Sequence, residues 1–225
     1  MSSTWGNEIR AVIRKELRTE LRNRSATFTA VMLSVTTVFT LAFAFFGRQL
    51  TGDGAAGMLW AALLFAGVGT LTRAFVAEEE QGTGDLLRMW ARPHAVYWGK
   101  AIFAFAQMAL TGFLVAALFL LLTGVTVATP LMLIASILGG AAALSGTVTL
   151  VSAMIARGAN RGTLAGVVAL PLLLPLVALG VTAGRSAFEG LAQPAGWAGT
   201  AGVWMYTLLV FATAPYQFAA IWREP

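Results

Sequence analysis

The chain has 225 residues, of which 58% are hydrophobic and 11% are charged, and its formal net charge is +5. Charged side chains this scarce cannot cover a water-exposed surface, so the composition excludes an ordinary soluble domain and indicates lipid as the solvent. The absence of cysteine excludes disulfides, thiolate metal sites and cysteine-linked haem.

The first predicted element is a cytoplasmic amphipathic helix within residues 1–25. Its apolar residues recur at helical spacing and are Ile9, Val12, Ile13, Leu17 and Leu21. Its basic residues occupy the other faces and are Arg10, Arg14, Lys15, Arg18 and Arg22. We expect this helix to lie in the headgroup layer, where anionic lipid attracts basic side chains. The alternatives are a solvated start to the first span, and a signal peptide with a cleavage motif at residues 42–44.

Residues 26–225 are predicted to form an all-α membrane domain with six transmembrane helices. Several apolar stretches exceed the roughly 18 to 20 residues that a helix needs to cross the hydrocarbon layer, and alternating strand patterns are absent. The predicted spans are residues 26–46, 56–77, 99–123, 131–155, 162–183 and 199–221.

The distribution of Lys and Arg predicts the orientation of these spans. All of these residues except Arg48 and Arg185 fall before the first span, at or after the ends of the second and fourth spans, or at the carboxyl end. Cytoplasmic segments carry the excess of basic residues, so we expect a multi-pass protein of the cell inner membrane with both termini cytoplasmic. Because the positive charge follows the membrane, it does not indicate a nucleic-acid partner.

Prolines predict several details of the later spans. Residues 129–130, Thr-Pro, are a helix cap and a first helical residue, so spans three and four should form a tight hairpin. The PLLLP sequence at 171–175 predicts a kinked span five, and Pro215 predicts a bend in span six. Residues 184–198 are predicted to form the longest outer segment and to dip into the interface.

Span four is rich in small residues, among them Gly139, Gly140 and Gly146. Lipid provides no hydrophobic force between helices, so we expect these residues to allow close backbone approach. A substrate path would be the alternative role of this helix, along Ser145, Thr147 and Thr149.

The chain lacks the groups that would energise transport. We count Arg73 as the only ionisable side chain within the spans and assign Lys100 to the cytoplasmic flank, so no ion-coupling carboxylate is expected at membrane depth. No Walker A sequence occurs, and His94, interpreted as an ordinary loop residue, cannot by itself form a metal pair. We therefore predict a non-catalytic subunit that binds no cofactor and is driven by another chain.

The most distinctive segment lies within a predicted cytoplasmic loop, residues 78–98, and has the sequence EEEQGTGDLLRMWARP up to Pro93. Acidic residues and glycines precede a short amphipathic helix that Pro93 should stop. Leu86, Leu87, Met89 and Trp90 would leave an apolar surface on this element, as expected of a docking helix. The alternative is a solvated acidic cap that only fixes topology.

This segment, with the preceding RKELRTELRNR sequence and six spans, resembles the permeases of ABC-2 exporters, and more closely the CcmB family of haem exporter subunits in cytochrome c maturation. The resemblance implies a half-transporter that pairs with a second copy of itself and with a CcmA-like ATPase, which would bind ATP and Mg²⁺. It also implies CcmC-like and CcmE-like haem-handling partners, with haem as a possible cargo. The implied coupling residues are Glu78, Glu79, Glu80, Gly82, Asp85, Leu86 and Leu87.

Two other functions are compatible with the sequence. One is an ABC-2 exporter permease for a drug, lipid or polysaccharide. The other is a non-transporting scaffold that assembles haem-handling proteins in the membrane.

Overall fold

The computed structural model describes residues 4–22, 25–71, 87, 89–157, 161–190 and 196–223. These residues form seven helices and no strand. The helices are α1 (Trp5–Arg22), α2 (Ser25–Ala44), α3 (Gly52–Leu71), α6 (Pro93–Thr123), α7 (Pro130–Arg157), α8 (Arg161–Glu189) and α9 (Trp197–Arg223).

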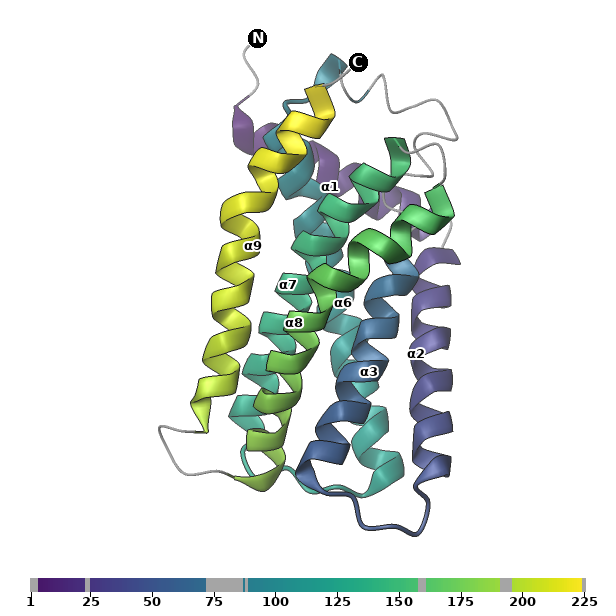
Figure 1. Ribbon diagram of the computed structural model, residues 1–225. Coiled ribbons are helices and arrows are strands. Elements are labelled where there is room, and N and C mark those ends of the chain that lie inside the picture. The colour runs from purple at the N-terminus through teal and green to yellow at the C-terminus, as the bar shows by residue number, and fades with distance from the viewer. Residues whose placement is uncertain are drawn as a thin grey trace.

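The six helices from α2 to α9 run side by side, and α1 lies across one end of the bundle (Figure 1). We call this the α1 end; α6 begins here and α9 finishes here. Helix α7 is central, because it packs against α3, α6, α8 and α9 and 78% of its apolar stretch is buried, compared with 28% for α9. Helices α3, α6, α8 and α9 therefore each present a face to α7, whereas α2 packs on α3 and α6.

The described part of each predicted span lies almost entirely within one helix, and the described residues confirm an all-helical membrane body. Four of the helices are long and apolar enough to cross a membrane, over Pro93–Thr123, Pro130–Ala156, Pro171–Glu189 and Trp197–Trp222. Within α2, residues Phe28–Ala44 form a shorter apolar helix. The end of the predicted second span, with Arg73, lies outside the described residues.

Two predicted boundaries were wrong. Helix α6 begins at Pro93 and not at residue 99, because Arg92 is extended (ψ 144°) and proline suits the first helical turn, where no backbone donor is needed. The outer segment predicted from residue 184 begins only at Gly190, since α8 remains helical to Glu189. Gly190 ends it with a φ of 68° and donates its N–H to the carbonyl of Ser186.

The predicted hairpin between spans three and four is confirmed. Helix α6 ends at Thr123, where Gly124 takes a left-handed φ of 66° and donates its N–H to the Leu120 carbonyl. Helix α7 begins at Pro130, as the sequence predicted. The Thr129 N–H donates to the Ala187 carbonyl at 2.9 Å, which fastens this connection to the end of α8.

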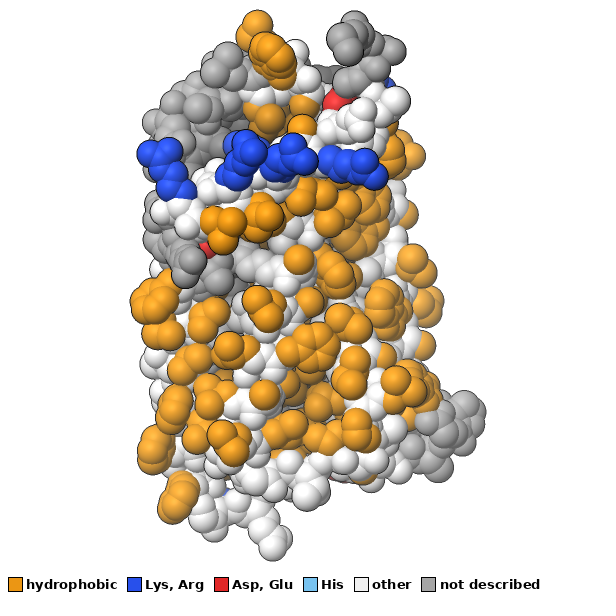
Figure 2. Space-filling view, turned by 180° about the vertical axis from the view of Figure 1, so that it is seen from behind, with side chains coloured by type: hydrophobic (Ala, Val, Ile, Leu, Met, Phe, Trp, Pro, Cys, Tyr) orange, Lys and Arg blue, Asp and Glu red, His pale blue; other side chains and the backbone are white. Residues whose placement is uncertain are grey.

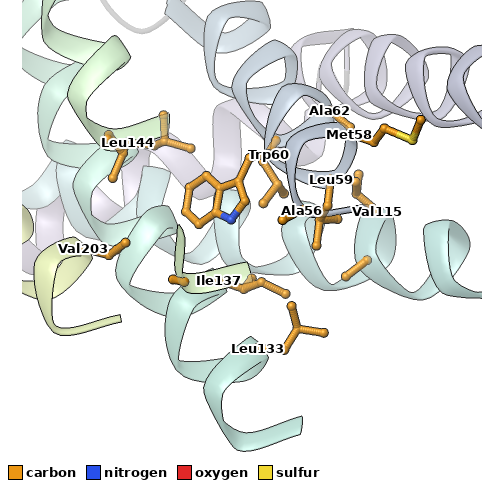
Figure 3. Packing of buried hydrophobic residues seen from close by; sticks show 14 of the residues in the cluster. Ala56, Met58, Leu59, Trp60, Ala62, Val115, Leu133, Ile137, Leu144 and Val203 are labelled. Carbon is orange, nitrogen blue, oxygen red and sulfur yellow. The ribbon is translucent and has the colours of Figure 1, made fainter. Parts of the chain in front are cut away.

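The core of the bundle is organised around Trp60 of α3, which is 1% exposed (Figure 3). A Cβ atom on Gly140 of α7 or Gly180 of α8 would overlap the indole ring, so both positions require glycine. We call this arrangement the Trp60 slot. The predicted packing role of span four is confirmed here and at Gly146, where an added Cβ would lie 2.8 Å from Val210 of α9.

The polar residues of α7 are mostly satisfied within the helix. The Ser145 hydroxyl donates to the Ala142 carbonyl, and the Thr149 hydroxyl donates to the Ser145 carbonyl. Helix α8 accommodates Pro171 and Pro175 in its interior, and its first part runs obliquely to the rest (Figure 1).

Candidate coupling site

Most of the predicted coupling residues lie outside the part of the chain that the structure describes. These are Glu78, Glu79, Glu80, Gly82, Asp85 and Leu86. We call residues 78–91 the coupling segment. Leu87 is described, and it forms the end of this segment together with Met89, Trp90 and Ala91. The acidic part of the coupling element stays a prediction.

The end of the coupling segment presents apolar side chains to the surface. The Ala91 N–H donates to the Leu87 carbonyl at 3.1 Å, which closes a helical turn. Leu87 packs inward, whereas Met89 and Trp90 are 80% and 83% exposed. Two large apolar side chains with so little protein contact, beside charged residues at the end of the bundle, indicate an interaction surface.

Leu87 and Ala91 pack against a buried apolar cluster of α6, α7 and α9 residues. The rings in and around this cluster, which we call the aromatic cluster, are Tyr97, Trp98, Phe211, Phe218 and Trp222. Trp98 stacks on Phe211 with ring centroids 5.1 Å apart, and Phe218 stacks on Trp222 at the same separation. Tyr97 is fully buried between them. The cluster joins α6 to α9, so a displacement of Leu87 acts on the start of one transmembrane helix and the end of another.

Tyr97 also connects the cluster to α7. Its hydroxyl donates to the Gly146 carbonyl at 3.3 Å, which is possible because Gly146 has no side chain to hold the helices apart. Burial raises the free energy of any unpaired polar group, so this hydrogen bond fixes the ring position. Helices α6, α7 and α9 thus meet at Tyr97.

A second connection, the α1–α6 junction, lies beside the coupling segment. Val12 of α1 is 4% exposed and packs on Gly99 of α6, where an added Cβ would lie 2.6 Å from Val12 Cβ. Lys100 is 3% exposed, and its Nζ lies 2.8 Å from Oε1 of Glu16. Two adjacent residues of α6 therefore hold α1, one by shape and one by charge.

Glu8 of α1 reaches the residue that precedes α6. Its Oε1 lies 3.4 Å from Nε of Arg92, and its Oε2 accepts the Arg92 N–H at 3.4 Å. Arg92 directly follows Ala91, the last residue of the coupling segment. Glu8 therefore links α1 to the junction between that segment and α6.

Opposing effects set the pKa of Glu16. Burial raises it, but the ammonium groups of Lys100 and Lys15 together outweigh burial and hold the pKa below its ordinary value. Burial lowers the pKa of Lys15, and Lys100 adds to this effect, against the attraction of Glu16. Lys15, Glu16 and Lys100 thus form a charged cluster at the junction, and the Glu16 carboxylate is ionised at neutral pH.

Arginine side chains dominate the exposed face of α1. Arg10, Arg14, Arg18 and Arg22 are exposed, whereas Glu8 and Glu16 turn toward α6. Figure 2 shows a row of basic side chains at one level, directly next to the apolar body of the bundle. Leu17 and Leu21 are also exposed, at 48% and 60%, so the apolar face of α1 is shared between the protein and its surroundings. This geometry suits a helix in the headgroup layer.

Sequence reasoning missed the acidic side of this junction. Lys100 was assigned to a flank, although it follows Gly99 at the start of the predicted third span, and the structure places it in the α1–α6 interface. The recurrence of Glu8 and Glu16 on one side of α1 was the available signal. His94 lies in the first turn of α6 and not in a loop, with its ring 5.8 Å from that of Tyr216.

Among the described residues, no group of His, Cys, Asp and Glu could hold a metal ion.

Comparison with known proteins gives consistent results. A family model described as CcmB protein matches residues 7–223. Heme exporter protein B of Bradyrhizobium diazoefficiens is 31% identical over 195 residues, covering 80% of this chain and 82% of the relative. Heme exporter protein B of Rhodobacter capsulatus is 34% identical over 170 residues, covering 75% of this chain and 77% of the relative. The family match includes both α1 and the coupling segment.

Proposed function

The chain belongs to the CcmB protein family, and from this membership we propose that it is the membrane subunit of an ABC transporter for cytochrome c maturation. Its relatives are named heme exporter protein B, which supports a role in haem export. In this role the chain has six transmembrane helices, α2, α3 and α6 to α9, in an arrangement like that of ABC-2 exporters. It carries no catalytic site of its own.

The observation that carries this proposal is the exposed apolar turn at Met89 and Trp90. A cytosolic ATPase binds there and at the acidic residues Glu78, Glu79, Glu80 and Asp85. Closure of the ATPase on ATP and Mg²⁺ pushes the turn, and Leu87 passes the displacement to the aromatic cluster. Since α6 and α9 meet in that cluster, one contact tilts two helices together.

The orientation follows from the charges. The α1 end faces the cytoplasm of an inner-membrane protein, with both termini on that side, because basic residues collect at cytoplasmic surfaces. The row of arginines on α1 lies among anionic headgroups and holds the helix at a fixed depth. With α1 fixed, the junctions at Arg92 and Lys100 give α6 a point about which to move.

The complex contains a second copy of this chain, a CcmA-like ATPase, and CcmC-like and CcmE-like haem-handling proteins. The work delivered through the coupling segment exports haem or releases a haem-loaded chaperone. In this role haem is a cargo and not a resident cofactor of the chain.

Replacement of Met89 and Trp90 by serine tests the docking surface. We expect the double variant to lose about tenfold or more of the ATPase that copurifies with it, since large apolar contacts dominate such interfaces. Phe46→Ser is the matched control, because Phe46 is 82% exposed at the other end of the bundle. Equal recovery of the ATPase with both variants would refute the docking role.

Glu79→Lys combined with Asp85→Lys tests coupling. We expect membrane insertion to be unchanged, while ATP-dependent maturation of c-type cytochromes is lost. Normal maturation in this variant would leave the acidic residues as a topological cap. Normal c-type cytochromes in a deletion strain would favour an exporter of another cargo, and maturation with an inactive ATPase would favour a scaffold.

A further inference from the structure

The end of the bundle opposite α1 contains a cavity of about 570 Å³. It opens between the α2–α3 connection, the α6–α7 connection and the end of α8. Its lining includes Arg48, Gln49, Gly52, Gly124, Phe188 and Glu189. This volume is in the range of small-molecule sites, and none of these residues belongs to the coupling site.

The walls of this cavity are held in place. The Thr129 N–H donates to the Ala187 carbonyl at 2.9 Å, which fixes the α6–α7 connection to α8. Asp53 of α3 lies 3.4 Å from Arg185 of α8, and a Cβ on Gly52 would lie 2.5 Å from Glu189. A side chain at residue 52 would therefore displace the Glu189 side chain. The cavity is therefore formed in advance of any ligand.

Opposite charges line the cavity. The guanidinium of Arg48 is exposed and has no hydrogen-bond or ionic partner within the described part of the chain. Glu189 accepts from Nε of Arg185 at 2.8 Å, and a carboxylate can accept about four hydrogen bonds, so it retains capacity. A ligand that satisfies both residues carries an anionic and a cationic group within one small unit.

The position of the cavity indicates where this ligand comes from. Phe43 and Phe46 precede Arg48 and are 72% and 82% exposed, which is suited to the boundary between the hydrocarbon layer and the headgroups. The cavity therefore lies at headgroup depth, on the side away from the arginine row of α1. That row attracts negative charge only, whereas this cavity offers both signs.

We propose that this cavity binds the headgroup of a zwitterionic phospholipid with a primary amine, phosphatidylethanolamine. Arg48 donates to the phosphate, and the ammonium group donates to Glu189. Guanidinium and phosphate form charge-assisted hydrogen bonds, and the ammonium of ethanolamine has three N–H donors for a carboxylate. The bound headgroup bridges the α2–α3 connection and the end of α8.

The test compares lipids retained by the purified full chain, with native mass spectrometry as the readout. The probes are phosphatidylethanolamine, phosphatidylcholine, which lacks the N–H donors, and phosphatidylglycerol, which lacks the positive charge. We expect preferential retention of phosphatidylethanolamine. Arg48→Ala should lower its retention about tenfold, since a hydrogen bond to a charged group contributes about 1.5 kcal/mol or more. His94→Ala, in the first turn of α6 at the other end of the bundle, should leave its retention unchanged.

Glu189→Gln separates the two charges. It should remove the preference for phosphatidylethanolamine over phosphatidylglycerol while retaining lipid binding through Arg48. A preference that survives this change, or equal retention of the three lipids by the unmodified chain, would overturn the proposal. Occupation of the cavity by a copurifying protein, and not by lipid, would also overturn the proposal.

A measurement without variants guards against misfolding. Added phosphatidylethanolamine should raise the melting temperature of the unmodified chain more than phosphatidylcholine does, and soluble phosphoethanolamine should compete at high concentration. Absence of either effect would contradict a headgroup site. None of these readouts requires the ATPase, so they are independent of the proposed function.

Discussion

The Trp60 slot and the α1–α6 junction both bring helices together over a glycine, but they fill the space differently. In the slot, a rigid indole occupies the space left by Gly140 and Gly180, and its buried N–H has no partner among the described residues. At the junction, Val12 fills the space over Gly99, and the adjacent Lys100 forms an ion pair with Glu16. The slot is therefore specified by shape, and the junction by shape and charge together.

This difference bears on how the molecule can move. A close-packed apolar contact has few alternative arrangements, because any shift opens voids or creates overlaps. Ion pairs on flexible side chains tolerate small displacements and respond to pH. We therefore expect the middle of the bundle to move as a unit and the α1 end to adjust.

The largest expected effect comes from filling the slot. Gly180→Leu would place a side chain where the indole of Trp60 lies, and overpacking of this kind costs about 3 kcal/mol or more. We expect little folded protein in fluorescence-detected size-exclusion chromatography. Gly57→Leu is the matched control on α3, because an added Cβ there meets nothing within 4 Å. Comparable yields for the two variants would show that the slot is not rigid.

The next effect concerns charge at the junction. Lys100→Met leaves Glu16 without its buried partner, and removal of one member of a buried pair costs about 3 kcal/mol. We expect a large fall in melting temperature and faster proteolysis of the chain before α2. Glu16 then keeps only the partly exposed Lys15 as a partner, so adding Glu16→Leu removes the buried carboxylate and should restore most of the stability. A double variant as unstable as the single one would argue against the pair.

A smaller effect is expected from Gly99→Ala, which adds one methyl group against Val12. The overlap should loosen α1 at a cost of about 1 to 2 kcal/mol, and Val12→Ala in the same chain should reverse most of it. Limited proteolysis between α1 and α2 reports the detachment. If Gly99→Ala leaves the cleavage rate unchanged, α1 can reposition without loss, and the contact is less tight than that of the slot.

Tyr97→Phe removes the hydrogen bond to the Gly146 carbonyl but keeps the ring. We expect a loss of about 1 kcal/mol in unfolding free energy, measured by chemical denaturation in detergent. Phe218→Leu, which removes a ring from the same cluster, serves as a comparison for packing alone. A stability gain in Tyr97→Phe would mean that the hydroxyl is not paired.

The weakest effect is the dependence on pH. The native pKa of Glu16 is held below its ordinary value of 4.5, so its ion pairs stabilise the junction fully above that value. This contribution is lost as the pH falls through the lower, native pKa. Proteolysis with an acid-active protease should therefore release α1 progressively in acid, and Glu16→Gln should abolish the trend. A trend that is identical in Glu16→Gln would assign it to another group.

The sequence by itself determined the class of protein and the position of most helices. Long apolar segments force a helical membrane body, since unpaired backbone groups cannot lie in hydrocarbon. The start of α7 at Pro130 was predictable from the residue types alone, as was close helix packing over the glycines of α7. The apolar character of Leu87, Met89 and Trp90 is equally apparent from the residue types alone, whereas the direction in which each side chain points is not.

Only the tertiary structure decided which charges face the protein and which face the membrane. Helical periodicity places Glu8, Glu16 and the arginines of α1 around one axis, but it does not say that α6 takes the carboxylates and leaves the arginines outside. The glycines that accommodate Trp60 likewise come from distant parts of the chain. Local sequence fixes hydrogen bonds within a helix; contacts between helices depend on shape and charge contributed by distant segments, and these meet only when the bundle packs.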